Sequence, residues 1–172
     1  MPMLDAFIPE GALKPEAEER LMARLTDLLL KHEGVDPRNE RARSIAWVFV
    51  HRPQIFVAGS TASVPRYRFV ASVPEGQYDA ERRSAVVAAI TEAVLDAEEG
   101  AYERSADRVW VFTNEVPDGT WGGRGRIFHL PDVAALVHGE PARVMAAERL
   151  AQRRHAEANA ILAEAARDPS SK

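Results

Sequence analysis

The sequence predicts an α+β fold in which two tandem β-α-β units form one four-stranded mixed sheet with two helices on one face, plus a short hairpin and a C-terminal helix. The main observation behind this prediction is an internal repeat. Three segments recur in the same order: Ile8-Pro9-Glu10-Gly11 as Val73-Pro74-Glu75-Gly76, Leu25-Thr26-Asp27 as Ile90-Thr91-Glu92, and Trp47-Val48-Phe49 as Trp110-Val111-Phe112. The first two pairs are offset by 65 residues and the third by 63, so the second copy is shorter by two residues. A second observation is that both copies show the same order of strand-like and helix-like patterns.

Each copy begins with a short apolar strand, which the Pro-Glu-Gly segment ends. An amphipathic helix follows, with apolar residues on one face and an early proline or a capping Asp79 at its start. A second strand, rich in β-branched and aromatic residues, closes each copy. The expected strands are Met3 to Ile8, Ile45 to Val50, Tyr67 to Val73 and Arg108 to Thr113, and the expected helices are Pro15 to Glu33 and Asp79 to Glu98.

The arrangement of these elements follows from chain connectivity. Two parallel strands joined by a helix cross over right-handedly, which places both helices on one face of the sheet. The opposite face is then uncovered, and this predicts oligomerisation, most simply with the sheets packed into a closed ring.

The remainder of the chain begins with a glycine-rich segment. We expect a loop there, then a short edge strand at Ile127 to Leu130, a helical turn at Pro131 to Val137 and a helix from Pro141 to about Ala166. Residues 1–139 are therefore expected to form one domain, with repeat units at about 2–64 and 65–130, and residues 140–172 a C-terminal helical extension.

Composition limits the classes of function. The chain has 172 residues, of which 46% are hydrophobic and 28% are charged, as in soluble globular proteins. A formal net charge of −4 gives no electrostatic case for a nucleic acid or an anionic membrane. The absence of cysteine excludes disulfides and thiolate metal sites, and the histidines lack metal-ligand spacing, so we predict no metal. The N-terminal segment lacks the features of a signal peptide, which makes a cytoplasmic location the expectation.

The first candidate for chemistry is Pro2. Aminopeptidases remove an initiator methionine that precedes proline, and this would leave Pro2 with a free secondary amine. An apolar pocket and a nearby cation both lower the pKa of such an amine, because they penalise its charged form. An amine that titrates near neutral pH can take up and return a proton on a carbon next to a carbonyl group. Met-Pro is also a common way to begin a protein, so the candidate depends on its setting at the start of a strand.

At this point the sequence resembles the tautomerase superfamily, which includes 4-oxalocrotonate tautomerase and macrophage migration inhibitory factor. The resemblance covers about residues 2–137. It is carried by Pro2, the two Pro-Glu-Gly turns, the two Trp-Val-Phe strands and the Trp121-Gly-Gly-Arg-Gly segment. It implies a fused pair of β-α-β units that assembles as a homotrimer, and an N-terminal proline that acts as base and acid without a cofactor. It also implies that arginine or lysine residues, often from neighbouring chains, hold the carboxylates of the substrate.

The resemblance assigns roles to individual positions. Pro2 matches the catalytic proline. Trp121 falls where the family has a pocket phenylalanine, and Val73 falls at an active-site isoleucine of the cytokine-like members. Trp110 and Phe112 lie two residues apart, on the same face of their strand, where relatives place polar or cationic residues that contact the substrate. The pocket is therefore expected to be more apolar than in muconate-type tautomerases.

The arginine that binds a substrate carboxylate is less directly indicated. The arginine that 4-oxalocrotonate tautomerase carries after its Glu-Gly turn is replaced by Ala12 and Gln77 in the two copies. Arg124, inside the glycine-rich segment, and Arg43, before the strand of the first copy, are the first candidates. Further candidates of lower rank are Arg41, Arg66, Arg68 and Arg126.

These residues predict an isomerase, a tautomerase that interconverts keto and enol groups of a small-molecule 2-oxo acid, aromatic or apolar, with Pro2 as general base and acid. Two alternatives stay open. One is a hydratase or decarboxylase of the same superfamily, with protonated Pro2 as the acid. The other is a non-catalytic trimeric binding protein that retains the fold.

Overall fold

The computed structural model describes residues 2–167, and the chain forms two compact units, Met1–Val116 and Pro117–Lys172. The first unit holds both repeats. The segment 117–139, which the sequence analysis grouped with the repeats, belongs in the structure to the same unit as the C-terminal helix. In the described part of the chain no helix is long and apolar enough to cross a membrane.

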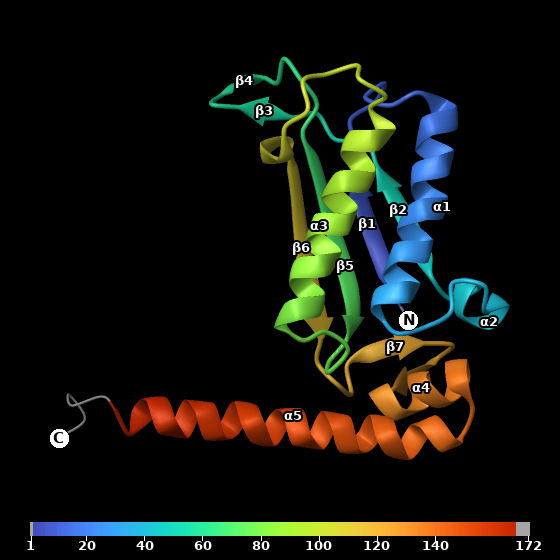
Figure 1. The fold of residues 1–172 in the computed structure, drawn as a ribbon, viewed down its shortest axis with the longest axis vertical. Coiled ribbons are helices and arrows are strands. Elements are labelled where there is room, and N and C mark those ends of the chain that lie inside the picture. Colours follow the sequence, from blue (N-terminus) through green and yellow to red (C-terminus); the bar gives the residue numbers. More distant parts are fainter. Residues whose placement is uncertain (1, 168–172) are drawn as a thin grey trace. The chain divides into compact units, whose positions relative to one another are not determined.

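The first unit is built on a mixed four-stranded sheet, which confirms the predicted fold class (Figure 1). Its strands, in spatial order, are β2 (Trp47–His51), β1 (Met3–Phe7), β5 (Tyr67–Pro74) and β6 (Val109–Val116). Each repeat contributes one parallel pair, β1 with β2 and β5 with β6, and the antiparallel pairing of β1 with β5 joins the repeats.

The strand register confirms the repeat residue by residue. Met3 pairs with Trp47 in the first parallel pair, and Arg68 pairs with Trp110 in the second. Arg68 lies 65 positions after Met3, and Trp110 lies 63 positions after Trp47, which are the two offsets in the sequence. The two halves of the sheet are therefore equivalent, and a residue in one half has a structural counterpart in the other.

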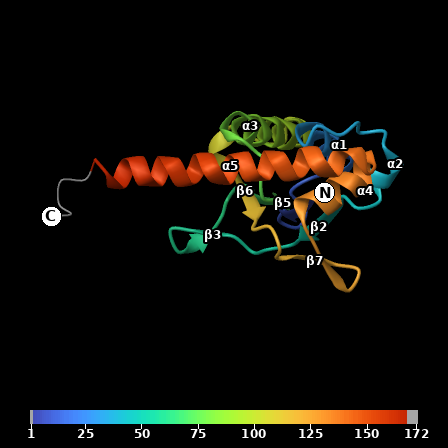
Figure 2. The same cartoon turned by 90° about the horizontal axis from the view of Figure 1, so that it is seen from below.

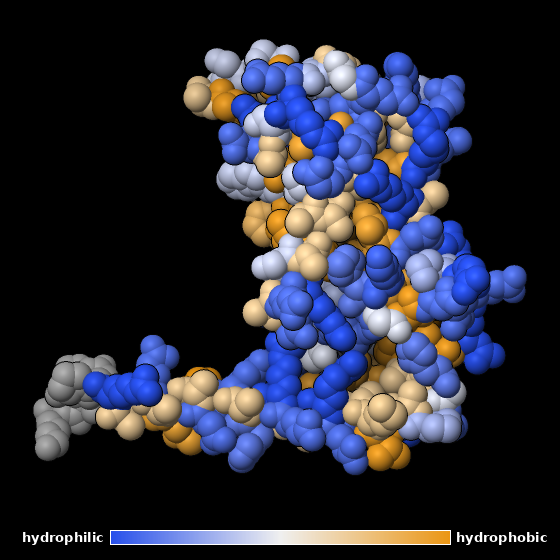
Figure 3. Space-filling model, in the orientation of Figure 1, coloured by the Kyte–Doolittle hydropathy of each residue, from blue (hydrophilic) through white to orange (hydrophobic). Residues whose placement is uncertain are grey.

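Two long helices cover one face of the sheet: α1 (Pro15–His32) and α3 (Ala80–Ala97) (Figures 1 and 2). Pro15 occupies the first turn of α1, where its missing N–H costs no hydrogen bond. The Asp79 side chain caps α3 by accepting a hydrogen bond from the N–H of Arg82 at 2.8 Å. The outer surface of the helices is mostly hydrophilic (Figure 3).

The core of the first unit lies between these helices and the sheet. Alternate residues of β1 and β5 point into it, and each buried leucine or phenylalanine contributes about 1.5–3 kcal/mol through removal from water. Fully buried examples are Leu4, Phe69, Leu25 and Ile90. The other face of the sheet carries the remaining strand residues and is uncovered by any element of this unit (Figure 2).

The connections contain short elements that the sequence analysis did not predict. Helix α2 (Glu40–Arg43) and the 3-10 helix η1 (Ala106–Arg108) precede β2 and β6, respectively. Strands β3 (Phe56–Val57) and β4 (Ser60–Thr61) form a hairpin around Ala58 and Gly59, both at positive φ. Such a turn normally carries asparagine, aspartate or glycine at its first position, and an alanine there gives no signal in the sequence.

The second unit contains a hairpin and two helices: β7 (Trp121–Gly123), β8 (Arg126–Phe128), α4 (Leu130–His138) and α5 (Pro141–Ala165). This hairpin agrees with the short hairpin of the predicted fold class, and its second strand ends at Phe128, two residues before the end of the edge strand expected at 127–130. Arg124 and Gly125 both have positive φ, as a two-residue hairpin turn of this kind requires.

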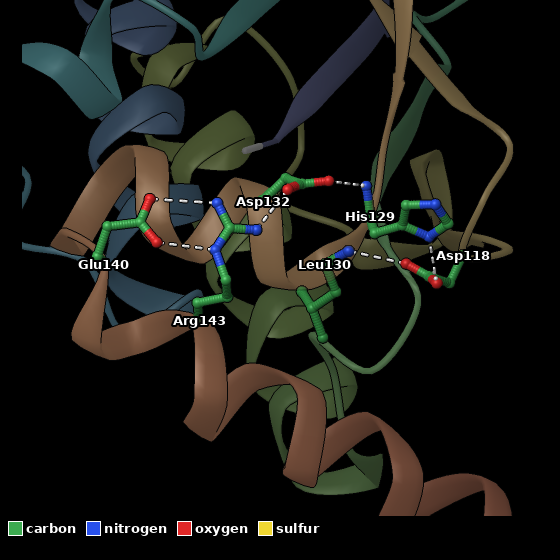
Figure 4. A network of polar contacts seen from close by, with 6 residues as sticks. All are labelled: Asp118, His129, Leu130, Asp132, Glu140 and Arg143. Carbon is green, nitrogen blue, oxygen red and sulfur yellow. Dashed lines mark hydrogen bonds and ion pairs between the residues drawn. The ribbon is translucent and has the colours of Figure 1, made fainter.

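Polar contacts hold the start of α4 and of α5 (Figure 4). The Asp118 carboxylate pairs with Nδ1 of His129 at 2.8 Å and accepts a hydrogen bond from the N–H of Leu130 at 2.7 Å. Arg143 of α5 binds both Asp132 of α4 and Glu140. The two helices also share a small apolar cluster around Leu130, Ala146 and Leu150.

Candidate active site

Pro2 lies at the start of the central strand β1 and is buried. Its carbonyl oxygen accepts a hydrogen bond from the N–H of Trp47 at 3.4 Å, so the backbone of Pro2 is held by the neighbouring strand. The next residue, Met3, pairs with Ser72, and continuing this register places Pro2 at the level of Val73. Pro2 is therefore part of the sheet and not of a free tail.

Val73 has no exposed surface and packs in the core of the first unit. Its backbone lies at the same level as Pro2, but its side chain faces the helices. Val73 therefore lies in the core behind the strand end that is level with Pro2. A direct role in substrate binding stays a prediction.

Polar groups gather at the same end of the sheet as Pro2. The side-chain amide of Gln77 donates a hydrogen bond to the carbonyl oxygen of Glu33, at the end of α1, at 3.2 Å. Glu115 of β6 accepts hydrogen bonds from the N–H groups of Gly76 and Tyr78 and pairs with Arg83. These groups come from different elements of the first unit. Glu33, Tyr78 and Glu115 were not among the candidates predicted from the sequence.

The surroundings at this end of the sheet shift the pKa values of Tyr78 and His32. Burial raises the pKa of the Tyr78 phenol well above its usual range, and the carboxylates of Glu33 and Glu115 raise it further. Burial also lowers the pKa of His32, and the charges of Lys31 and Arg82 act in the same direction. Tyr78 therefore stays protonated, and this end of the sheet favours neutral over charged forms for both groups.

Trp110 and Phe112 lie on the uncovered face of the sheet, as their spacing predicts. They are 65% and 46% exposed, and their rings meet edge-on with centroids 6.5 Å apart. Their counterparts in the first repeat, Trp47 and Phe49, form a similar edge-on pair at 6.2 Å. The uncovered face thus presents two matched aromatic pairs to its surroundings.

A cavity of about 600 Å³ opens beside Trp110. Its lining combines apolar side chains with three cations and one acid: Phe7, Phe56, Trp110, Arg66, Arg68, Arg108 and Asp107. The guanidinium of Arg68 lies over the rings of Phe7 and Phe112, at 5.0 and 5.3 Å from their centroids. An apolar cavity with cations at its wall suits an aromatic anion.

Within one chain this cavity is far from Pro2. Phe7, which lines it, ends β1, and Pro2 precedes the start of that strand. Phe7 is five residue steps after Pro2, which at about 3.4 Å per step puts the two roughly 17 Å apart. A single chain therefore does not bring the arginine-lined cavity and Pro2 together.

Arg43 lies at the end of α2, before β2, and its guanidinium is engaged. It forms an ion pair with Asp27 of α1 and donates a hydrogen bond to the carbonyl oxygen of Pro37 at 2.9 Å. These contacts give Arg43 a structural role in holding α2 against α1. A role in substrate binding stays a prediction.

Arg124 and Trp121 belong to the hairpin of the second unit. Arg124 is exposed at the turn, whereas Trp121 is 6% exposed and pairs with Phe128 across the hairpin. That Arg124 and Trp121 bind the substrate at the site of Pro2 stays a prediction. In the first unit, His51 is engaged with Asp5 at 2.7 Å and stacks on Phe7 with centroids 4.3 Å apart.

Among the described residues there is no group of three or more histidine and acidic side chains that could hold a metal ion.

Comparison with known proteins identifies the class of this fold. Residues 71–130 match a family model described as Tautomerase enzyme, a range that covers the end of β5, α3, β6 and the hairpin. No curated protein matches the chain in sequence. The family match and the duplicated β-α-β architecture confirm the resemblance to the tautomerase superfamily.

Solved structures share the fold at low sequence identity. A fused 4-OT described as a symmetric trimer is 17% identical, with a TM-score of 0.59 over 73% of this chain and 94% of that chain. The Pt0534 protein inactivated by 2-oxo-3-pentynoate is 22% identical, with a TM-score of 0.59 and the same coverage. A macrophage migration inhibitory factor from Toxoplasma gondii is 16% identical, with a TM-score of 0.56 over 73% of this chain and 99% of that chain.

Proposed function

We propose that this protein is a tautomerase that interconverts the enol and keto forms of an aromatic or apolar 2-oxo acid, with the Pro2 amine as general base and acid. The observation that carries the proposal is the burial of Pro2 at the start of the central strand, in a fold whose second repeat matches the tautomerase family. A rigidly held amine in such a place keeps a constant position relative to a bound substrate.

The reaction requires one proton-carrying group. The free amine of Pro2 removes the proton from the enol hydroxyl, and the resulting ammonium returns a proton to the neighbouring carbon, which gives the ketone. The amine is regenerated, so the enzyme is unchanged and no cofactor is consumed. Partial desolvation of the amine lowers its pKa toward neutrality and so makes both forms available at physiological pH.

The binding surface is proposed to come from a neighbouring subunit. A homotrimer, the state of one fused 4-OT of this fold, would cover the aromatic face and place the arginine-lined cavity of one chain near Pro2 of the next. Trp110 and Phe112 would then contact the apolar part of the substrate, and Arg68 its carboxylate. Arg124, Arg43, Val73 and Trp121 are kept as further substrate-binding candidates.

The decisive experiment compares the wild type with Pro2→Ala. We expect the wild type to convert phenylenolpyruvate, followed by its enol absorbance, and Pro2→Ala to lose this activity at least about 100-fold, the scale of a single general base. Circular dichroism and light scattering serve to show that the variant keeps its fold and its oligomeric state. Full activity of the variant, or mass spectrometry that finds Met1 retained, contradicts the mechanism.

A covalent probe gives an independent readout. The compound 2-oxo-3-pentynoate, which inactivates Pt0534, carries the 2-oxo acid group expected in the substrate. We expect it to modify the wild type at the Pro2 nitrogen and to leave Pro2→Ala unmodified at that residue, as read by peptide mass spectrometry.

A further inference from the structure

We infer that Glu33, at the end of α1, is a positioning residue for the Pro2 amine: its buried carboxylate accepts a hydrogen bond from the amine and holds it in one orientation. The inference rests on the proposed function for its catalytic meaning, but its electrostatic part is testable without any activity. It starts from the equivalence of the two repeats.

The second repeat shows directly what a residue in this place does. Glu98, at the end of α3, is 4% exposed, and its carboxylate accepts a hydrogen bond from the Tyr67 hydroxyl at 2.9 Å. Tyr67 begins β5, so this contact ties the end of the helix to the start of the strand that precedes it in the β-α-β unit. Arg108, at the start of the next strand, completes the cluster.

The first repeat has the same arrangement with different partners. Glu33 lies 65 positions before Glu98, and Pro2 lies 65 positions before Tyr67, which is the offset that the strand register confirms. Glu33 and Glu98 are both the residue at the end of their helix, and the N–H of each donates to the equivalent carbonyl, that of Leu29 or of Val94. Glu33 is therefore the acid that faces the start of β1.

Topology and burial agree with this placement. In a β-α-β unit the helix runs antiparallel to its strands, so α1 ends where β1 begins (Figure 1). Glu33 is 5% exposed, and Gln77, which donates to its carbonyl oxygen, follows the end of β5, the strand end level with Pro2. Glu98 is 4% exposed, so the two acids lie at a similar depth in their repeats.

The chemical difference between Tyr67 and Pro2 indicates which group of Pro2 can donate a hydrogen bond to Glu33. Tyr67 reaches Glu98 with a side-chain hydroxyl, whereas a proline side chain has no donor. Once Met1 is removed, the nitrogen of Pro2 becomes the donor at the start of β1. In its free form this nitrogen has one hydrogen and one lone pair, so a hydrogen directed at Glu33 leaves the lone pair facing away from the core, toward a substrate.

Glu33 also affects the charge state of the amine. A nearby carboxylate favours the ammonium form and so opposes the effect of burial on the Pro2 amine. Several other charged or titratable groups surround this end of the sheet, and their charges act on the same amine: His32 on α1, Arg82 and Arg83 on α3, Tyr78 after β5 and Glu115 on β6. Among these, Glu33 is the one whose repeat counterpart contacts the counterpart of Pro2.

The test measures the titration of the Pro2 nitrogen by NMR in protein labelled with 15N-proline. We expect the titration midpoint of this nitrogen, which is its pKa, to be lower by at least about one pH unit in Glu33→Gln. This variant keeps the shape of the side chain and loses its charge. The acidic limb of the kcat/KM profile should move by the same amount. Glu33→Asp, with a retained but withdrawn carboxylate, should give an intermediate midpoint.

Asp36→Asn is the matched control, because Asp36 is an exposed carboxylate three residues further along the chain and its partner is Arg38. We expect no change of the Pro2 midpoint in this variant. A Pro2 midpoint that is the same in wild type and in folded Glu33→Gln overturns the inference, and so does an equal shift in Asp36→Asn. Full activity of Pro2→Ala together with a shifted midpoint in Glu33→Gln would overturn the proposed function and leave the Glu33–Pro2 contact standing.

Discussion

At the scale of single residues, the most tightly packed polar feature of the molecule is the buried pair of Arg108 and Glu98. The guanidinium of Arg108 meets both carboxylate oxygens of Glu98, at 2.5 and 2.6 Å, and donates to the carbonyl oxygen of Glu103 at 2.8 Å. The hydrogen bonds with Glu98 raise the pKa of Arg108, so its guanidinium stays charged. Each charge compensates the other in the buried pair, and the loss of one partner destabilises the fold because the other charge is left buried and uncompensated.

We therefore expect Arg108→Met to lower the free energy of unfolding by about 3 kcal/mol, since it leaves the Glu98 carboxylate buried and uncompensated. The double variant Arg108→Met/Glu98→Leu removes both charges and should regain most of this loss. Urea denaturation followed by tryptophan fluorescence measures the three proteins. A single variant as stable as the wild type would show that water reaches Glu98 and replaces Arg108.

At the scale of elements, the start of α4 carries a histidine, His129, whose pKa is raised by its acidic neighbours. His129 precedes the helix, and its hydrogen bond with Asp118, with added charge attraction from Asp118 and Asp132, raises its pKa. A raised pKa in the folded state means that charged His129 stabilises the helix start below its unfolded pKa of about 6.5. This stabilisation is lost as the pH rises through the folded pKa. Because His129 is exposed, salt also weakens the contact.

We expect the first amides of α4, from Leu130 onward, to exchange hydrogen faster at pH 8.5 than at pH 6 after correction for the intrinsic rate. The His129→Gln variant should lose this pH dependence. Hydrogen exchange followed by mass spectrometry measures both proteins on the peptide that spans α4. A pH dependence that persists in His129→Gln would contradict this assignment and point to another titrating group.

At the scale of the whole molecule, the uncovered face of the sheet is the surface through which we propose that chains associate. Four large aromatic side chains on it are 45–65% exposed, which is costly for a protein that stays monomeric. They are Trp47, Phe49, Trp110 and Phe112. The same face carries Trp110 and Phe112, two of the candidate substrate contacts, and Trp110 also lines the cavity, so assembly and substrate binding are proposed to depend on one surface.

We expect Phe49→Lys to shift the proposed homotrimer toward monomers, because it places a charge on the aromatic face, on the edge strand β2, and Phe49 does not line the cavity. Light scattering coupled to size-exclusion chromatography gives the mass of the wild type and the variant. Ile161→Lys on α5, where Ile161 is 66% exposed, is the control and should keep the wild-type mass. Equal masses for the wild type and Phe49→Lys would assign the aromatic face to another role.

The sequence by itself determined the order of elements, the duplicated unit and the equivalence of the two halves, because periodicity and repeats are local properties that survive in any correct fold. It also indicated Pro2, Trp110 and Phe112 through their positions in strands. Only the tertiary structure decided which side chains are available. It packed Val73 into the core, paired Arg43 with Asp27, and placed Glu33, at the end of α1, at the end of the sheet where Pro2 lies. Such contacts join residues distant in the chain, and no local pattern records them.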